Sequence, residues 1–312
     1  GVAMFFRQLQ YLLALSKEEH FGRAAERCNV SQPSLSTAIK QLELTLGGPV
    51  VRRGRRFLGF TEEGHRVIEW AERIISQRDA MLIELSGMRE NFQGQLRLGA
   101  MPNSSPILPL FSHLISKKHP GVKVDIHFLG IEQTKIGLNN FSLDVGITYL
   151  NHAELTGLNT LPIYDEVLSL LVPNTKEYKG LTTISWKDAA ELPLCLLDKS
   201  MHERKIVDEA FARVGVEPRL TVTVSDSILN LIFHVMFAEQ VTVIPKHFIR
   251  MPGQFPGVRI LDLVEPEVSQ EVGLVWSPSE PMMPLAGVMV SIVKELKDSG
   301  ELERRLGDLS AP

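Results

Sequence analysis

A short segment near the start of the chain places hydrogen-bonding side chains at helical spacing. A helix predicted from residue 32 turns an apolar side inward, made of Leu35, Ala38, Ile39, Leu42 and Leu46. The outward or N-terminal positions then hold Ser31, Gln32, Pro33, Ser34, Ser36, Thr37 and Lys40. Hydroxyl, amide and ammonium groups at the start of a helix can bond to base edges in the major groove of DNA. An ordinary solvated face would also be polar, so this pattern alone leaves both interpretations open.

The elements around this helix favour the DNA-reading interpretation. Phe21, Ala24, Ala25 and Cys28 have helical spacing before a tight turn, and Ser31 and Pro33 are typical of a helix start. Beyond the second helix, four arginines surround a glycine between two short apolar runs, which predicts a hairpin wing. These arginines are Arg52, Arg53, Arg55 and Arg56. They are expected to contact phosphates or the minor groove, so that the segment forms a winged helix-turn-helix.

The distribution of charge supports a local anion-binding surface. Residues 1–60 contain nine Lys and Arg against four Asp and Glu, a net charge of +5, whereas the remainder contains 24 against 33, a net charge of −9. Phosphate attraction is therefore expected at the N-terminal part only. The acidic remainder is expected to stay away from DNA.

Length and composition predict two or three globular units in the cytoplasm. The chain has 312 residues, 44% of them hydrophobic, with no apolar run near 18 residues and no signal-peptide pattern. No nucleophile elbow, phosphate-binding loop, zinc-protease or dinucleotide motif occurs, which argues against an enzyme. The histidines are scattered, so no metal is predicted. Cys195 lies in an apolar run, and inert packing is favoured over a redox thiol.

A long helix is predicted after the wing, from Thr61 to about residue 91. Its apolar positions alternate in steps of three, four and seven, as in a coiled-coil seam. They are Val67, Ala71, Ile74, Met81, Leu85 and Met88. A helix with such a stripe either packs onto its own domain or pairs with a second chain. Pairing is preferred because two winged helix-turn-helix segments would then bind one face of the DNA.

The segment from Phe6 to Gly64 resembles the LysR-type transcriptional regulators of bacteria. The similarity rests on the opening helix from Phe6 to Tyr11, the core from Ser31 to Ser36 after Ala24-Ala25, Gln41-Leu42-Glu43, and Leu58 to Gly64. Gly48 with Val50-Val51, and Thr37, depart from the usual pattern. The resemblance implies double-stranded promoter DNA and a small-molecule effector as partners, a homodimer through the linker helix, and a homotetramer. It also allows RNA polymerase as a partner, and no membrane.

The resemblance also implies the domain organisation. A winged helix-turn-helix domain is expected at 4–61, a linker helix and hinge at 62–92, and an effector domain at 93–307. In the family this domain has two α/β subdomains similar to periplasmic solute-binding proteins, here 93–165 with 268–307, and 166–267. Alternating strand and helix patterns agree with an α/β fold and predict mostly parallel sheets. Strands are expected at 95–99, 122–128, 143–148, 167–172, 192–197, 219–224, 241–244, 258–261 and 271–276, and helices near 106–118, 132–140, 203–214, 227–239 and 284–298.

Three loops are expected to meet at the effector site, because ligands of α/β sheets bind beyond the carboxyl ends of strands and near helix N-termini. The predicted residues are Met101, Pro102, Asn103, Ser104, Ser105, Gly130, Ile131, Tyr149, Ser200, Met201, His202 and Arg204. The hydroxyls and amides of the first loop are expected to hold a carboxylate. Ile131 and Tyr149 replace the polar anchors of relatives that respond to aromatic acids, which weakens the expectation of such a ligand.

The main prediction is a sequence-specific DNA-binding regulator whose promoter binding and bending respond to this effector. No cofactor besides the effector is predicted. Two alternatives remain: a thiol-based redox-sensing regulator that uses Cys195, and a cytosolic solute-binding protein. The second leaves the winged head unexplained, and the first lacks a second cysteine within reach.

Overall fold

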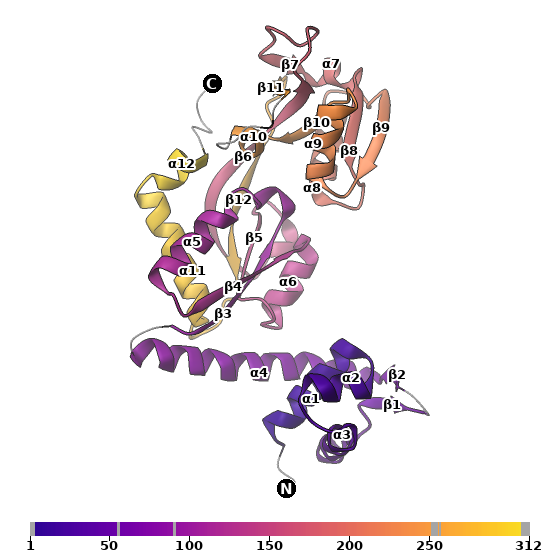
Figure 1. Ribbon diagram of the computed structural model, residues 1–312, viewed down its shortest axis with the longest axis vertical. Helices are drawn as coiled ribbons and strands as arrows, with labels where there is room; N and C mark the ends of the chain where they lie inside the picture. The colour runs from indigo at the N-terminus through magenta and orange to yellow at the C-terminus, as the bar shows by residue number, and fades with distance from the viewer. Residues whose placement is uncertain (1–3, 55–56, 90–91, 251–254, 256, 307–312) are drawn as a thin grey trace. The chain divides into compact units, whose positions relative to one another are not determined.

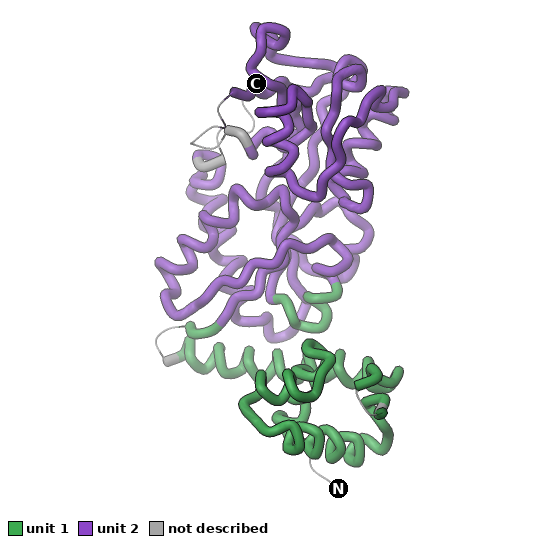
Figure 2. Tube along the Cα trace, turned by 45° about the vertical axis from the view of Figure 1, so that its right-hand side comes forward, with its two compact units in different colours: residues 1–94, 136–143 green, residues 95–135, 144–312 purple. Residues whose placement is uncertain are grey.

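The computed structural model describes residues 4–54, 57–89, 92–250, 255 and 257–306. The chain divides into two compact units, one of residues 1–94 with 136–143 and one of residues 95–135 with 144–312 (Figure 2). No helix in the described residues is long and apolar enough to cross a bilayer.

The first unit is mainly helical (Figure 1). Its elements are α1 (Phe6–Glu18), α2 (Phe21–Arg27), α3 (Gln32–Leu46), β1 (Val51–Arg53), β2 (Phe57–Phe60) and α4 (Glu62–Arg89). α1 packs against α2, α3 and α4. Leu12, Leu15, Leu35, Ile39 and Leu42 are fully buried in the core that these helices share. The predicted inward side of α3 is therefore confirmed at Leu35, Ile39 and Leu42. Ala38 is half-buried, and Leu46 is 45% exposed because it ends the helix beyond this core.

Local capping defines the ends of these helices. Ser31 Oγ accepts a hydrogen bond from Ser34 N at the start of α3, and Gly47 ends that helix with φ +80°. Thr61 Oγ1 accepts a hydrogen bond from Gly64 N at the start of α4, so the predicted cap is confirmed. The cap of α2 is His20, whose Nδ1 accepts hydrogen bonds from Gly22 N and Arg23 N.

The second unit is α/β. Its first half contains β3 (Gly94–Ala100), α5 (Leu108–Lys118), β4 (Val122–Phe128), α6 (Ile131–Asn139), β5 (Val145–Tyr149), β12 (Ser269–Trp276), α11 (Pro284–Asp298) and α12 (Glu301–Leu306). The last residues of α6, from 136 onward, are counted with the first unit. Its second half contains β7 (Thr183–Ser185), α7 (Trp186–Ala190), β8 (Pro193–Leu197), α8 (His202–Arg213), β9 (Leu220–Ser225), α9 (Ile228–Phe237), β10 (Thr242–Pro245), α10 (His247–Arg250) and β11 (Val258–Val264). Short 3-10 turns lie at Pro102–Ser104 and Ala153–Leu155.

One long strand, β6 (Asn159–Pro173), belongs to both halves. Its first part pairs with β12 from Asn159 to Val167, and its last part pairs with β10 and β11 between Leu168 and Pro173. The sheet has the order β4-β3-β5-β12-β6-β11-β7, and β8 and β9 form a separate parallel pair. The two halves are therefore joined through β6, which is continuous across both.

The prediction of mostly parallel sheets was wrong for this sheet. β12 runs antiparallel to β5 and β6, and β10 and β11 run antiparallel to β6, while β3–β5 and β11–β7 are parallel. Helix–strand alternation predicts parallel neighbours only when consecutive strands share a sheet region. Here β6 crosses between the halves and β12 runs back beside its first part, which places an antiparallel ribbon in the centre.

Candidate nucleic-acid interface and ligand cavity

The N-terminal half of α3 exposes the side chains that were predicted to read DNA. Gln32, Pro33, Ser34, Thr37 and Lys40 are exposed, and Ser36 is half-buried. Ser31 is also exposed, but its Oγ lies 2.7 Å from that of Ser34 and caps the helix. The hydroxyls of Ser31 and Ser34 thus bond to each other. The other exposed polar side chains of this surface are those of Gln32, Thr37 and Lys40.

The wing is a two-stranded antiparallel hairpin, with Val51 opposite Phe60 and Arg53 opposite Phe57. Glu43 of α3 fixes its start, because Oε1 accepts hydrogen bonds from Val50 N at 2.9 Å and Val51 N at 3.1 Å. Arg52 is exposed on β1. Arg55 and Arg56 lie outside the described residues, as does the side chain of Arg53. In the sequence Glu43 contributed only to the family resemblance, and its hydrogen bonds to the start of the wing were missed.

The apolar stripe of α4 divides into two parts. Ala71 is fully buried in the core of the first unit, and Val67 and Ile74 pack against that core. Farther along, Met81, Leu85 and Met88 are 53%, 43% and 76% exposed. The prediction that all six residues form one pairing seam is corrected at Ala71, which is fully buried in the winged head of its own chain, while Val67 and Ile74 are half-buried against the same core. The exposed stripe begins only after Ile74.

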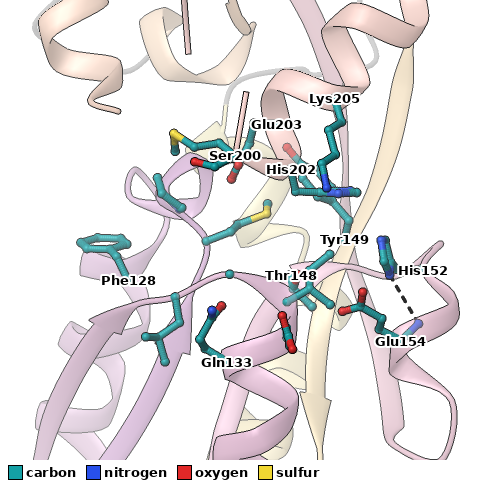
Figure 3. Close-up of a pocket in the computed structure, with 17 residues that line it drawn as sticks. Phe128, Gln133, Thr148, Tyr149, His152, Glu154, Ser200, His202, Glu203 and Lys205 are labelled. Carbon is teal, nitrogen blue, oxygen red and sulfur yellow. Dashed lines mark hydrogen bonds between the residues drawn. The ribbon is translucent and has the colours of Figure 1, made fainter. Parts of the chain in front are cut away.

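The second unit contains a cavity of about 480 Å³ between its two halves (Figure 3). It is lined by Met101, Pro102, Phe128, Leu129, Gly130, Ile131, Glu132, Gln133, Thr148, Tyr149, His152, Glu154, Ser200, Met201, His202, Glu203 and Lys205. Ser200, His202, Glu203 and Lys205 come from the second half, whereas Gln133, Thr148 and Glu154 come from the first (Figure 3). Cavities of this size accommodate small organic ligands.

Eight of the twelve predicted effector residues line this cavity. They are Met101, Pro102, Gly130, Ile131, Tyr149, Ser200, Met201 and His202. The structure therefore brings the three predicted loops together, because the ends of β3, β4 and β5 face the start of α8.

Four predicted effector residues do not line the cavity. Ser104 Oγ donates to Met101 O and Ser105 Oγ donates to Pro102 O. These two hydroxyls, which were expected to hold a carboxylate, therefore form hydrogen bonds within their own turn. Arg204 Nε bonds to Asp208 and its Nη1 donates to Leu197 O. Asn103 is 98% buried beneath the cavity. The two serines are displaced from the site by hydrogen bonds inside their own turn, and Arg204 by its position on another face of α8 than the cavity-lining residues.

Several lining residues were missed in the sequence. Phe128, Thr148, His152 and Glu154 follow or end strands β4 and β5, which is the position where the parallel-sheet rule places ligands. Glu203 and Lys205 lie in the first turn of α8. Strand ends could have indicated the first group, whereas the inward direction of Glu203 depends on the rotation of α8.

A buried polar network lies under the cavity. Asn103 Nδ2 donates to Tyr149 Oη and to Glu166 Oε1, both at 2.9 Å, and His247 Nε2 lies 3.1 Å from Asn103 O. Burial raises the pKa of Glu166 to about 7, against the hydrogen bonds from Tyr149 and Asn103, which lower it. Burial lowers the pKa of His247 to about 4. Among the described residues, the carboxyl group of Glu166 on β6 forms hydrogen bonds but no ion pair.

Two histidines meet edge to face at the cavity. The rings of His152 and His202 have centroids 4.8 Å apart, and the ring of Tyr149 lies 5.5 Å from that of His202. Burial, followed by the charge of His152, lowers the pKa of His202. Because His152 and His202 belong to different halves of the unit, this aromatic contact joins the two walls. The described residues contain no group of three or more His, Cys, Asp or Glu side chains placed to hold a metal ion.

Comparison with known proteins covers both units. The "Bacterial regulatory helix-turn-helix protein, lysR family" model matches residues 6–65, and the "LysR substrate binding domain" model matches residues 89–298. The DNA-binding transcriptional dual regulator OxyR of Escherichia coli is 26% identical over 285 residues, which cover 89% of this chain and 91% of that protein. A probable RuBisCO transcriptional regulator of Nostoc sp. is 29% identical over 215 residues, 68% of this chain and 64% of that protein.

Solved structures agree with the observed fold. Full-length OxyR from Pseudomonas aeruginosa, in a variant form, superposes with a TM-score of 0.73 at 26% identity and covers 94% of this chain and 95% of its own. CbnR in complex with its target DNA superposes with a TM-score of 0.69 at 22% identity and covers 94% and 99%, a similarity of fold. With both domain models matched in the expected order, the chain belongs to the LysR family of DNA-binding transcriptional regulators.

Proposed function

We propose that this chain binds promoter DNA through α3 and the wing, as a cytoplasmic homotetramer built from dimers, and that a small molecule in the cavity changes how the DNA is bent. The observation that carries the proposal is the cavity itself, whose walls come from both halves of the second unit. A ligand that binds both walls favours one arrangement of the halves over another. It can shift that equilibrium only by its difference in affinity for the two arrangements, about 1.4 kcal/mol for each factor of ten.

The specific DNA contacts are part of the same proposal. Gln32, Ser36 and Thr37 are assigned to base edges, and Lys40 and Arg52 to phosphates, because amide and hydroxyl groups distinguish bases whereas single positive charges mainly attract the backbone. No cofactor other than the effector is proposed, and RNA polymerase is the partner expected of a promoter-bound regulator.

The test compares two tryptophan substitutions at neighbouring positions. Ser200 lines the cavity and is exposed, whereas Lys199 is exposed outside it. A library of metabolite amines, alcohols and carboxylic acids is screened for compounds that change the bending angle of promoter DNA in a circular-permutation gel assay. Ser200→Trp should abolish the response to any active compound, and Lys199→Trp should retain it. Equal responses in both variants would disprove an effector site in the cavity.

Thiol-based redox sensing is the second candidate, because several relatives are named hydrogen peroxide-inducible genes activators. The environment of Cys195 disfavours it. Cys195 is fully buried on β8, its Sγ lies 3.5 Å from Val241 O, and burial raises the pKa of the thiol to about 11. A reactive cysteine needs an accessible thiolate. The other cysteine, Cys28, belongs to the first unit, and no cysteine lines the cavity.

A further inference from the structure

The ionisable side chains around the cavity are predominantly acidic. Glu132, Glu154 and Glu203 line it, and Lys205 is the single lysine or arginine among the lining residues. Two further basic residues that line the cavity, His152 and His202, contact each other edge to face, and burial lowers the pKa of His202, which favours its neutral form. An anionic ligand would therefore meet three carboxyl groups and one ammonium group.

Glu203 is the most informative of these residues. Its side chain lies at the cavity wall but is 92% buried, and it forms no ion pair with any described residue. Burial raises the pKa of the Glu203 carboxyl, against a hydrogen bond from the main chain of its own residue at the start of α8, which lowers it. Burying a carboxylate without an opposite charge is costly, and proteins normally supply a cation or neutralise the group. Glu166, fully buried beneath the same wall, also lacks an ion-pair partner among the described residues.

The nearby basic groups and helix ends do not provide an anion site. Arg204 is engaged with Asp208 and Leu197 O, and Lys246 pairs with Asp262. The first residues of α6 and α8 line the cavity, yet each helix carries a glutamate in its first turn, Glu132 or Glu203. A carboxylate already placed at a helix N-terminus satisfies the dipole that an anionic ligand would need.

We propose that the cavity binds a small organic cation, a protonated amine on a short carbon skeleton, with its ammonium group on the Glu203 carboxylate. This inference rests on the proposed function, since it names the chemical class of the effector. Glu154 on the opposite wall is placed to bind a second donor of the same ligand (Figure 3). The rings of Phe128, Tyr149 and His202 supply the apolar and aromatic surface that suits the carbon skeleton and the cation.

Three matched series of compounds test the charge class. Linear diamines, diols and dicarboxylates of equal chain length, from propane to hexane, are titrated into the full-length protein at up to about 10 mM, where a ligand with a dissociation constant of about 1 mM still raises the melting temperature. At least one diamine should stabilise the protein and change the bending of promoter DNA, while the diol of equal length should not. Calorimetry then gives the dissociation constant.

Charge-removing variants locate the binding group. Glu203→Gln keeps the size of the side chain and should weaken diamine binding by about 10-fold or more, because a charge-assisted hydrogen bond in a buried site is lost. Glu154→Gln, at an exposed position, should weaken it by about 3-fold. Lys199→Gln, outside the cavity, should have no effect. Circular dichroism checks that each variant is folded.

The outcomes separate this inference from the proposed function. If dicarboxylates bind and lose affinity in Ser200→Trp while diamines do not bind, the effector cavity stands and the cation assignment is wrong. If no diamine stabilises the protein at about 10 mM, or if Glu203→Gln binds diamines as tightly as the wild type, the cation assignment is likewise overturned. If compounds change DNA bending equally in Ser200→Trp and Lys199→Trp, the proposed function itself fails.

Discussion

The hydroxyl of Tyr149 donates a 2.5 Å hydrogen bond to Oε1 of Glu166. This bond links the end of β5 to the strand that passes through both halves of the second unit, and both residues are more than 95% buried. Asn103 bonds to both partners. This polar network lies where the two halves of the unit join. It can hold the halves in one arrangement only if Glu166 is in the protonation state that its low-polarity surroundings favour.

Stability of the second unit should depend on pH through Glu166. Its pKa is about 7 in the folded protein and 4.5 as an unperturbed carboxyl, so its contribution to stability is complete below pH 4.5 and is lost as the pH rises through 7. Glu166→Gln removes this dependence. Relative to the wild type, the variant should gain up to about 3 kcal/mol in free energy of unfolding between pH 4.5 and 8.

Urea denaturation followed by Trp186 and Trp276 fluorescence measures this difference, since both residues are buried in the second unit. His247, with its pKa lowered to about 4, acts in the opposite direction, because its contribution is lost as the pH falls from 6.5 toward 4. That effect is common to both proteins and cancels in the comparison. A difference that stays constant with pH would show that Glu166 titrates as an ordinary carboxyl.

The junction between the wing and α4 requires a glycine at position 64. A Cβ there would lie 2.1 Å from the carbonyl oxygen of Val50, a backbone atom that is held by the hairpin. Gly64→Ala should destabilise the first unit by about 2–4 kcal/mol, a typical cost for a clash with fixed backbone. Thermal unfolding measures it. Gly48→Ala is the control, because its Cβ would meet only the movable carboxyl end of Glu63, and a similar loss in both variants would contradict this explanation.

Substitutions on α3 and on the wing should affect DNA binding in different ways. Gln32→Ala or Ser36→Ala should reduce discrimination between the preferred site and single-base variants by about 1–3 kcal/mol for a base-contacting residue. Arg52→Ala should weaken binding to all duplexes and lower the slope of log affinity against log salt by about 1. Fluorescence anisotropy with a selected operator and its variants distinguishes the two. Equal losses on every sequence for Gln32→Ala would remove its assignment to base edges.

The exposed part of the α4 stripe should mediate dimerisation. Leu85→Glu places a charge among Met81, Leu85 and Met88, so the dimer dissociation constant should rise by about 10-fold or more. Analytical ultracentrifugation of the full chain measures this constant. Glu84→Ala, at an exposed position on the same helix, should leave the dimer intact. A fully dimeric Leu85→Glu protein would place the interface elsewhere.

Mild peroxide should leave Cys195 unmodified. With a thiol pKa of about 11, roughly one molecule in 10⁴ carries the thiolate at pH 7, and the sulfur is fully buried. Mass spectrometry of peptides after treatment of the folded protein gives the extent of oxidation. Rapid formation of a sulfenic acid or a disulfide at Cys195, accompanied by altered DNA binding, would establish the redox alternative instead.

Local sequence patterns determined much of this protein's secondary structure and the position of its cavity loops. Helical spacing defined the core side of α3, the Thr61 cap of α4 and the span of α11, because these features depend on residues within a few positions of each other. The same reasoning placed the three loops that line the cavity, since the ends of strands in an α/β sheet converge. The family resemblance, carried by residues in the first unit, was confirmed over both units.

Tertiary structure alone decided the mixed sheet, the division of the α4 stripe and the chemistry of the cavity wall. Strand direction depends on which distant segments pair, as β6 and β12 do. The burial of Ala71 and the packing of the half-buried Val67 and Ile74 depend on where α1 packs against α4. Glu203 faces the cavity and Arg204 does not, although they are adjacent in sequence, because the rotation of α8 turns consecutive side chains about 100° apart. That rotation is set by packing, which no local spacing records.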